Sequence, residues 1–330
     1  MTDSSAAPLS AGPGPDLSVI VVVSPGAATM HRVLECLRAQ TIRDRIELVI
    51  VDMQETPLPD GFFGVTTVAT APEHTPETRL AAGIRAATAP VLALLEDHAF
   101  PEPRWAESLL KAHRGSWSVV GAVAMNANPD SLLSWTNFLL SYGKWSEPAK
   151  WGETQEVSVH NMSIKRAALA DLDGDLAGMF SREGGLLPRL RACGHRFYLE
   201  PGARYHHANP SLLSSTAELR FNAGRLYGAR RSALGQWSVG RRLMYVAGAP
   251  LIPFVRLARL HRELFAAGRH RDLVPRVFPA LLLGLALDAA GQMVGYLTGA
   301  GRSERTLAAF EADRVRHLTR RDRLRLAGTA

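Results

Sequence analysis

Three polar residues, Glu96, Asp97 and His98, directly follow an apolar run at residues 91–95. A short apolar run bounded by prolines is typical of a strand buried on both faces, so these side chains should lie where that strand leaves its sheet. Open α/β sheets bind ligands at that edge. Two carboxylates beside an imidazole can hold a divalent cation, and such a cation can neutralise a diphosphate. The structural alternative is that Asp97 caps the helix that follows.

The segments on either side predict an α/β sheet. Residues 17–24 and 46–51 are β-branched and nearly all apolar, and residues 31–40 between them keep the apolar spacing of a helix. This pattern predicts a βαβ unit with a parallel strand pair and a right-handed crossover. Further strands are expected at residues 65–69, 91–95, 118–124, 157–164 and 197–200, and further helices at residues 77–87, 105–113 and within 181–194.

Composition narrows the class of protein and its partners. The 330 residues can bury a large core, and the net charge of +7 favours anionic partners. Only Cys36 and Cys193 are present, which is too few for a disulfide framework and indicates a reducing compartment. The N-terminus lacks the pattern of a signal peptide, so we expect a cytoplasmic protein. Residues 1–16, rich in Ser, Ala, Gly and Pro, are expected to be a disordered tail.

Residues 213–330 differ from the rest in being basic and apolar. Residues 277–297 are mostly apolar but contain Asp288 and Gln292. Because an Asp at the centre of a spanning helix costs about 2.5 to 3.5 kcal/mol on insertion scales, we expect helices that lie in or against the membrane interface. Their arginines would then face anionic headgroups. A partly inserted hairpin, or packing on the catalytic domain or a partner in solution, are the alternatives.

Several nucleotide-binding classes are excluded by missing motifs. The turn at residues 24–29 has neither the glycine spacing of a dinucleotide fingerprint nor the Gly-Lys-Ser/Thr of a P-loop. Dehydrogenases and kinases of those types are therefore disfavoured. No zinc-finger, RNA-recognition or helix-turn-helix signature accounts for the basic charge, so we expect no nucleic acid partner.

Taken in order, five segments resemble the family 2 glycosyltransferases, which have a GT-A fold. The resemblance covers roughly residues 17–210 and is carried by Ser-Val-Ile-Val-Val-Val at 18–23, Leu-Arg-Ala-Gln-Thr at 37–41 with Glu-Leu-Val-Ile-Val-Asp at 47–52, Arg-Leu-Ala-Ala-Gly-Ile-Arg-Ala-Ala at 79–87, Leu-Glu-Asp-His-Ala-Phe-Pro-Glu-Pro-Arg-Trp at 95–105, and His-Asn-Met-Ser-Ile-Lys-Arg-Ala-Ala-Leu at 160–169. It implies a GT-A (Rossmann-like) mixed α/β sheet flanked by helices over residues 17–212. A C-terminal helical, membrane-associated region would then occupy residues 213–330.

The resemblance also implies ligands for a nucleotide-sugar donor. Asp52 matches the carboxylate that usually reads the base, and its alternative is a loop cap. Arg79 matches a basic residue near the nucleotide, where a guanidinium suits phosphate oxygens, and its alternative is an exposed helix arginine. Glu96 is assigned to the same donor site. Asn161 is expected to orient the acceptor or the donor sugar.

A divalent metal, Mn²⁺ or Mg²⁺, is the implied cofactor. Glu96, Asp97 and His98 fall on the family's Asp-x-Asp motif, but this copy ends in His98 where the usual pattern has a second Asp. The resemblance makes Asp97 the strongest metal candidate, while His98 would ligate a softer ion such as manganese or hydrogen-bond the diphosphate. His207 matches a family histidine near the metal or diphosphate, with the adjacent His206 as its rival.

Glu183 occupies the place of the family's catalytic carboxylate, just ahead of a helix. The commoner form is an acidic pair, and here Arg182 precedes the single acid. An inverting sugar transfer needs a base that accepts the proton of the acceptor hydroxyl, and a glutamate meets that need. The alternative is that Glu183 only supports the helix N-terminus.

These assignments predict an inverting glycosyltransferase that uses a nucleotide-diphosphate sugar. Its acceptor would be a saccharide or a lipid-linked molecule at the inner face of the cell membrane, in envelope polysaccharide or glycolipid assembly. Two alternatives remain open. The first is a catalytically silent GT-A-like module that binds nucleotide or scaffolds a membrane complex. The second is a sugar nucleotidyltransferase, disfavoured because its Gly-rich, Arg-containing loop is absent after Ser24.

Overall fold

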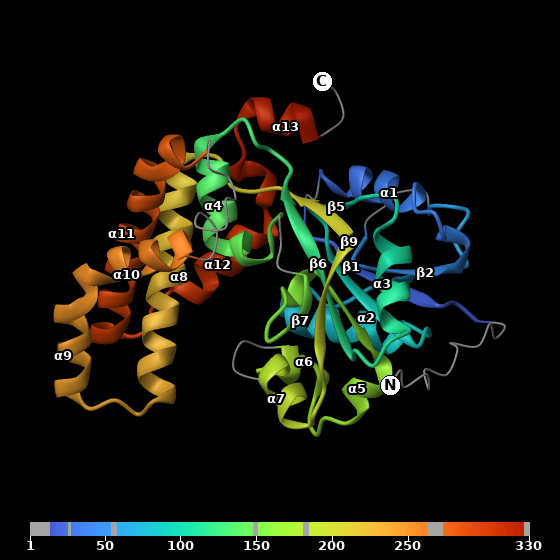
Figure 1. Ribbon diagram of the computed structural model, residues 1–330, viewed down its shortest axis with the longest axis horizontal. Helices are drawn as coiled ribbons and strands as arrows, with labels where there is room; N and C mark the ends of the chain where they lie inside the picture. The colour runs from blue at the N-terminus through green and yellow to red at the C-terminus, as the bar shows by residue number, and fades with distance from the viewer. Residues whose placement is uncertain are drawn as a thin grey trace, which may run out of the picture. The chain divides into compact units, whose positions relative to one another are not determined.

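The computed structural model describes residues 14–25, 28–53, 58–147, 151–180, 185–262 and 273–326 (Figure 1). Its internal contacts divide the chain into two compact units. The sheet unit comprises Met1–Ser24, Ala28–Met125 and Trp145–His207, and the helical unit comprises Pro25–Ala27, Asn126–Lys144 and Ala208–Ala330.

The centre of the sheet unit is a group of parallel strands. β1 (Leu17–Val22) pairs with β2 (Ile46–Val51) on one side and with β4 (Val91–Glu96) on the other, and β3 (Gly64–Val68) pairs with β2. Nearly every residue of β1, β2 and β4 is buried, which explains their almost continuous apolar sequences. The registers align the carboxyl ends of these three strands at one edge of the sheet.

Antiparallel strands complete a nine-stranded sheet with the order β3-β2-β1-β4-β8-β6-β9-β5, and β7 pairs with β9. Because β2 and β3 extend from one side of β1 and β4 lies on the other, the order of the chain reverses between β1 and β4. Such a switch point is where open α/β sheets bind their ligands. The added strands are β5 (Ala99–Pro101), β6 (Val119–Asn126), β7 (Gly152–Thr154), β8 (Met162–Lys165) and β9 (Phe197–His207).

Two strands differ from the sequence prediction. The strand expected at residues 157–164 begins only at Met162, after a short 3-10 helix, η3 (Val159–Asn161). The short strand expected at residues 197–200 continues through Pro201 to His207. Pro201 is tolerated because it lies between the residues that pair with β7 (197–199) and those that pair with β5 (205–207).

Helices cover this sheet, and α2 packs closely against β1. A Cβ atom added at Gly83 of α2 would lie 2.7 Å from Cγ2 of Ile20 in β1, so only glycine fits this helix–sheet contact. The helix begins at an N-cap, where the Thr75 hydroxyl accepts a hydrogen bond from the N–H of Thr78. The helices of the unit are α1 (Met30–Arg38), α2 (Pro76–Ala86), α3 (Trp105–His113), α5 (Arg166–Ala170), α6 (Leu176–Phe180) and α7 (Leu186–Ala192).

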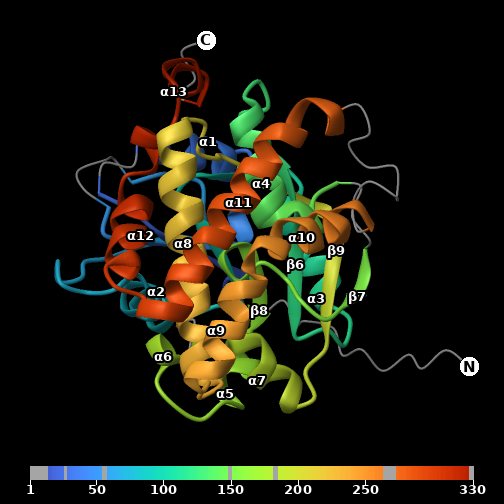
Figure 2. The same cartoon turned by 90° about the vertical axis from the view of Figure 1, so that its left-hand side faces the viewer.

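The helical unit is built around two long helices, α8 and α11, which pack along each other (Figure 2). Glycines allow their backbones to touch: a Cβ at Gly291 of α11 would lie 2.0 Å from the carbonyl oxygen of Phe221 in α8. The helices of this unit are α4 (Leu132–Tyr142), α8 (Leu213–Leu234), α9 (Val239–Gly248), α10 (Ile252–Leu260), α11 (Val274–Thr298), α12 (Ser303–Ala312) and α13 (Arg320–Leu326), with a 3-10 turn η4 (Ala249–Leu251) between α9 and α10.

Within the part of the chain that the structure describes, two helical stretches are long and apolar enough to cross a membrane, Val239–Leu260 and Pro275–Thr298. In the second, the buried Asp288 forms an ion pair with Arg256 of α10 and accepts a 2.9 Å hydrogen bond from Gln292. The predicted fold class, a mixed α/β sheet flanked by helices with a C-terminal helical region, is confirmed. The association of that region with a membrane stays a prediction.

Candidate metal and nucleotide site

Among the described residues, Glu96, His98 and His207 bring together three side chains that ligate metals. Their ligand atoms all lie within 4.8 Å of one another. An oxygen of Glu96 is 3.3 Å from Nε2 of His207, and the other is 3.9 Å from Nε2 of His98. Both imidazoles are buried, with ring centroids 4.7 Å apart. The cluster lies where β4 leaves the sheet, beside the switch point.

Strand pairing brings His207 into this cluster from a distant part of the sequence. Antiparallel pairing of β9 with β5 sets His207 opposite Ala99, the residue after His98. Because side chains alternate along a strand, the neighbouring His206 points to the other face and lies 3.1 Å from an oxygen of Glu102. Of the two histidines considered from the sequence, the structure places His207 in the cluster.

Asp97, expected to be the main metal ligand, is held by protein groups instead. One carboxylate oxygen accepts a 2.6 Å hydrogen bond from the N–H of Ser24, and the other accepts one of 2.8 Å from Nδ1 of His98. The Asp97 carbonyl oxygen accepts a 2.8 Å bond from the Thr29 hydroxyl. The described cluster therefore contains Glu96 in place of Asp97, because the strand ends with Glu96 directed to the histidines and Asp97 directed to the loop after β1.

Glu96 is fixed by Asn161, which the sequence assigned to substrate. Nδ2 of Asn161 donates a 2.6 Å hydrogen bond to Glu96, and Oδ1 of Asn161 accepts a 3.2 Å bond from the Glu96 N–H. Asn161 ends the 3-10 turn η3 and is completely buried. In this structure it positions the carboxylate of the cluster.

The electrostatics of the cluster keep both carboxylates ionised. Burial alone would raise the pKa of Glu96, but the imidazoles of His98, His207 and His160 lower that pKa well below its usual value. Burial would likewise raise the pKa of Asp97, but hydrogen bonds from His98 and Ser24 lower that pKa below its usual value. An ionised carboxylate is the form that ligates a cation.

The donor set fits one transition-metal ion. Ligands bound at about 2.1 Å lie at most about 4.2 Å apart. Both Glu96–histidine distances fall within that span, and all three ligand atoms lie within 4.8 Å of one another, so a small shift of the imidazoles suffices to complete the set. Nδ1 of His98 lies 2.8 Å from Asp97, so Nε2 is the ring nitrogen left to face an ion, and this buried nitrogen has no hydrogen-bond partner among the described residues. A carboxylate behind a ligating histidine is the usual outer support of a metal site.

Asp52 and Arg79 lie at the same edge of the sheet. Asp52 directly follows β2, two strands from β4, which separates the two backbones by roughly 10 Å. Its carboxylate accepts 2.7 Å hydrogen bonds from both the N–H and the hydroxyl of Thr70 and lies 3.5 Å from Nε of Arg79. The residue has φ 62°, a left-handed conformation that is uncommon outside glycine. The structure therefore brings Asp52 and Arg79 together.

Glu183, expected to be the base, lies outside the described residues, between α6 and α7. Three residues of the site were missed from the sequence: Ser24 and Thr29, which hold Asp97, and Tyr205. Tyr205 is completely buried two residues before His207, on the same face of β9. The one sequence signal that could have found Tyr205 is its position two residues before His207, because alternate residues of a strand point to the same face.

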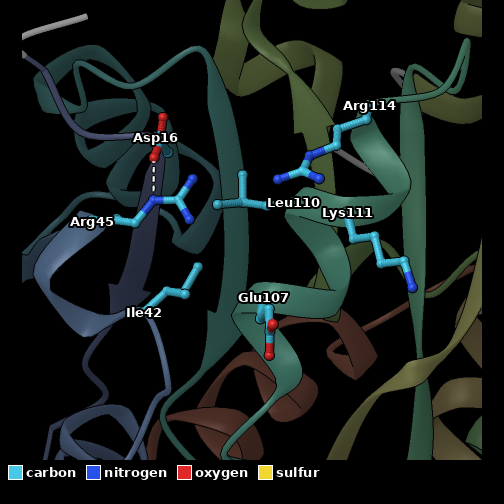
Figure 3. Close-up of a pocket in the computed structure, with 7 residues that line it drawn as sticks. All are labelled: Asp16, Ile42, Arg45, Glu107, Leu110, Lys111 and Arg114. Atoms are coloured by element: carbon cyan, nitrogen blue, oxygen red, sulfur yellow. Dashed lines mark hydrogen bonds and ion pairs between the residues drawn. The ribbon is translucent and has the colours of Figure 1, made fainter. Parts of the chain in front are cut away.

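A separate hollow of about 140 Å³ lies at the opposite edge of the sheet (Figure 3). Asp16 and Arg45 precede β1 and β2 there and form a 2.5 Å ion pair. Since both residues lie at the amino ends of the parallel strands, this hollow does not belong to the metal and nucleotide site. It is lined by Asp16, Ile42, Arg45, Glu107, Leu110, Lys111 and Arg114.

No family model and no curated protein matches the chain. Among solved structures, it is similar to the mannosyltransferase PcManGT from Pyrobaculum calidifontis in complex with GDP-Man and Mn²⁺, with 18% identity, TM-score 0.47, and coverage of 90% of this chain and 86% of that one. GalNAc-T7 with UDP, GalNAc and Mn²⁺ is 14% identical over 59% of this chain and 44% of its own, with TM-score 0.44. S. aureus TarS 1-349 is 12% identical, with TM-score 0.43 and coverage of 84% and 90%.

Proposed function

We propose that this protein is a metal-dependent glycosyltransferase that moves a sugar from a nucleotide-diphosphate donor to a hydroxyl acceptor. The observation that carries the proposal is the convergence of Glu96, His98 and His207 at the carboxyl edge of the parallel strands. That edge is the ligand-binding edge of such sheets, and Asp52 with Arg79 lies along it. The motifs at these positions resemble those of family 2 glycosyltransferases.

The residues divide between holding the donor and supporting the reaction. Asp52 reads the base, and Arg79 lies beside it with a guanidinium suited to phosphate oxygens. Glu96, His98 and His207 would hold Mn²⁺ or a similar ion, which when bound offsets the negative charge that develops on the departing nucleoside diphosphate. Asn161 and Asp97 keep Glu96 and His98 in their orientations.

We assign the base to Glu183. In an inverting transfer this carboxylate accepts the proton of the acceptor hydroxyl as the oxygen attacks the anomeric carbon. The role follows from its place ahead of α7 and from the need for a carboxylate on the acceptor side. Glu183→Gln keeps the shape of the side chain and removes its basicity, so it should lower kcat far more than KM for the donor.

Donor turnover tests the proposal. Release of nucleoside diphosphate from a panel of nucleotide sugars is measured with Mn²⁺, with Mg²⁺ and after EDTA. We expect one donor to be consumed with metal present, and EDTA, Glu96→Gln and His207→Ala each to lower the rate at least about 100-fold. His206→Ala is the matched control, because His206 points to the other face. Full activity of both cluster variants would reject this mechanism.

We also propose that the helical unit places the enzyme on the cytoplasmic face of the cell membrane. The basic and apolar composition of residues 213–330 supports this, together with the exposed apolar side chains of α9 and α10. A saccharide or lipid-linked acceptor of envelope polysaccharide or glycolipid assembly fits that place. The full chain should float with anionic liposomes at low salt, and failure to co-migrate would contradict the location while leaving sugar transfer unaffected.

A nucleotide-binding scaffold without catalysis is the second candidate. His98 in place of the usual aspartate favours it, because the change alters the donor set at the central motif. Nucleotide binding in the absence of turnover across the donor panel would support the scaffold. Turnover of any donor would reject it.

A further inference from the structure

The segment α9–η4–α10 exposes an unusual number of apolar side chains. Val239, Leu251 and Phe254 are 74%, 64% and 63% exposed. Soluble proteins rarely expose a contiguous apolar patch of this kind unless it binds something. The other large exposed apolar side chains of the segment are Leu243, Met244 and Val255.

The charge of this segment is entirely positive. Residues 239–262 contain five arginines and no Asp or Glu. From the end of η4 through α10, the exposed apolar positions 251, 254, 255 and 258 are followed at helical spacing by the exposed Arg259 and by the exposed Arg262, two residues after α10 ends. An apolar stripe that ends in cations complements a lipid with a hydrocarbon chain and an anionic headgroup.

An apolar groove of about 290 Å³ lies between this segment and α11. Its floor is a stripe of α11 from Leu282 to Met293 in which Ala286, Ala289 and Ala290 leave room above the helix. The spacing of this stripe keeps it on one helix face over roughly 16 Å. The opposite wall is formed by Ala249, Pro250, Pro253 and Phe254, and every lining residue is apolar.

The groove opens on the exposed apolar surface, because Phe254 belongs to both. The ion pair between Arg256 of α10 and the buried Asp288 of α11 ties the two helices together beside the groove. That pair keeps α10 against α11 rather than free to cross a bilayer alone. The two helices that line the groove, α10 and α11, therefore lie side by side in the helical unit (Figure 2).

We infer that this groove binds one hydrocarbon chain of an anionic membrane lipid, whose headgroup lies at Arg259 and Arg262. α9 and α10 then lie in the membrane interface with their apolar stripe directed to the lipid. The inference rests on the proposed membrane location of the helical unit but not on the proposed sugar transfer, because the groove and the metal cluster belong to different units.

Binding of lysophosphatidylglycerols of increasing chain length to the full-length protein, measured by calorimetry below the micelle concentration, tests the inference. We expect one lipid per protein and an affinity that rises about fourfold per methylene until the groove is full. Ala286→Phe and Ala290→Phe fill the exposed floor and should weaken binding at least about tenfold. Ala309→Phe, at an exposed position of α12 that does not line the groove, is the matched control and should bind as the native chain does.

Other outcomes overturn the inference. Equal affinity of the groove variants and the control, or affinity independent of chain length, would show that no chain enters the groove. A dimer of the native protein that Ala286→Phe dissociates in sedimentation would show that a second copy covers it. Arg259→Gln with Arg262→Gln should weaken binding of lysophosphatidylglycerol severalfold while sparing lysophosphatidylcholine, and an equal effect on both lipids would reject the headgroup contact. Melting curves of each variant establish that it is folded, and donor turnover should be unchanged.

Discussion

Asn161 and Glu96 hold each other through two hydrogen bonds of opposite direction. The amide nitrogen of Asn161 donates to the Glu96 carboxylate at 2.6 Å, and the amide oxygen accepts the Glu96 N–H at 3.2 Å. Since the same carboxylate lies 3.3 Å from Nε2 of His207, the orientation of Asn161 decides where the cluster has its oxygen ligand.

Asn161→Ala should therefore weaken metal binding without removing a ligand. Loss of an outer support typically costs about 10- to 100-fold in metal affinity. Calorimetric titration with Mn²⁺ measures the change, and His206→Ala serves as the variant expected to bind like the native protein. An unchanged affinity for Mn²⁺ in Asn161→Ala would mean that Glu96 keeps its place without this amide.

Comparing Asp97→Asn with Glu96→Gln separates a supporting carboxylate from a ligating one. Asp97 touches His98 Nδ1 and the N–H of Ser24, so Asp97→Asn should lower Mn²⁺ affinity about 10- to 100-fold. Glu96→Gln removes the only oxygen of the described cluster and should lower it further. If Asp97→Asn lowers Mn²⁺ affinity more than Glu96→Gln does, Asp97 is the main metal ligand, as predicted from the sequence.

The donor types predict which ions stabilise the fold. Imidazole suits Mn²⁺ and Zn²⁺ better than Mg²⁺, which prefers oxygen ligands. Thermal melting should therefore shift upward with Mn²⁺ or Zn²⁺ at concentrations where Mg²⁺ has little effect. His207→Ala should abolish the difference. Equal shifts with all three ions would contradict a site that uses two histidines.

Helix packing in the helical unit predicts that one added methyl group strongly lowers the stability of the protein. At Gly291 an added Cβ would meet the Phe221 carbonyl oxygen at 2.0 Å, so Gly291→Ala should destabilise the protein by about 1 to 3 kcal/mol through overpacking. A Cβ added at Gly240 of α9 would have no atom within 4 Å. Gly240→Ala should therefore leave the stability of the protein unchanged or raise it by up to about 1 kcal/mol through helix propensity. Urea unfolding measures both, and a neutral Gly291→Ala would mean that α8 and α11 are farther apart.

Stability should fall in mild acid because of His113. Burial lowers the pKa of this histidine to about 3, and its Nε2 lies 2.8 Å from the Ser163 hydroxyl. Between its unfolded pKa of about 6.5 and the folded value, only the unfolded chain binds the proton, so the stability present above pH 6.5 is lost as the pH falls. From pH 7.5 to 5.5 the loss should be about 1.4 kcal/mol.

Urea unfolding of the native chain and of His113→Gln at the two pH values measures this contribution. The variant is expected to be less stable at pH 7.5, because a buried side chain is replaced, but its stability should fall less toward pH 5.5. An identical fall in both proteins would show that His113 is protonated in the folded state.

Local patterns determined much of the sheet and the positions of the polar residues along it. The apolar runs at residues 17–24, 46–51 and 91–95 correspond to the parallel strands β1, β2 and β4 at the centre of the sheet, because a strand covered on both faces is apolar along nearly its whole length. Polar residues directly after such runs must lie at the carboxyl edge. The sequence alone therefore predicts that Asp52 and Glu96 lie at the same edge of the sheet.

The tertiary structure alone decided which side chains meet. Nothing local shows that Asp97 is bound by Ser24, 73 residues away, while Glu96 faces His207, because these contacts depend on strand order and register. The predicted end of β9 at residue 200 was wrong for the same reason: its continuation past Pro201 depends on short partner strands that are distant in the chain. The composition of residues 239–262 shows their positive, apolar character, but the groove beside α11 depends on tertiary contacts such as the Arg256–Asp288 pair, which holds α10 against a helix distant in the chain.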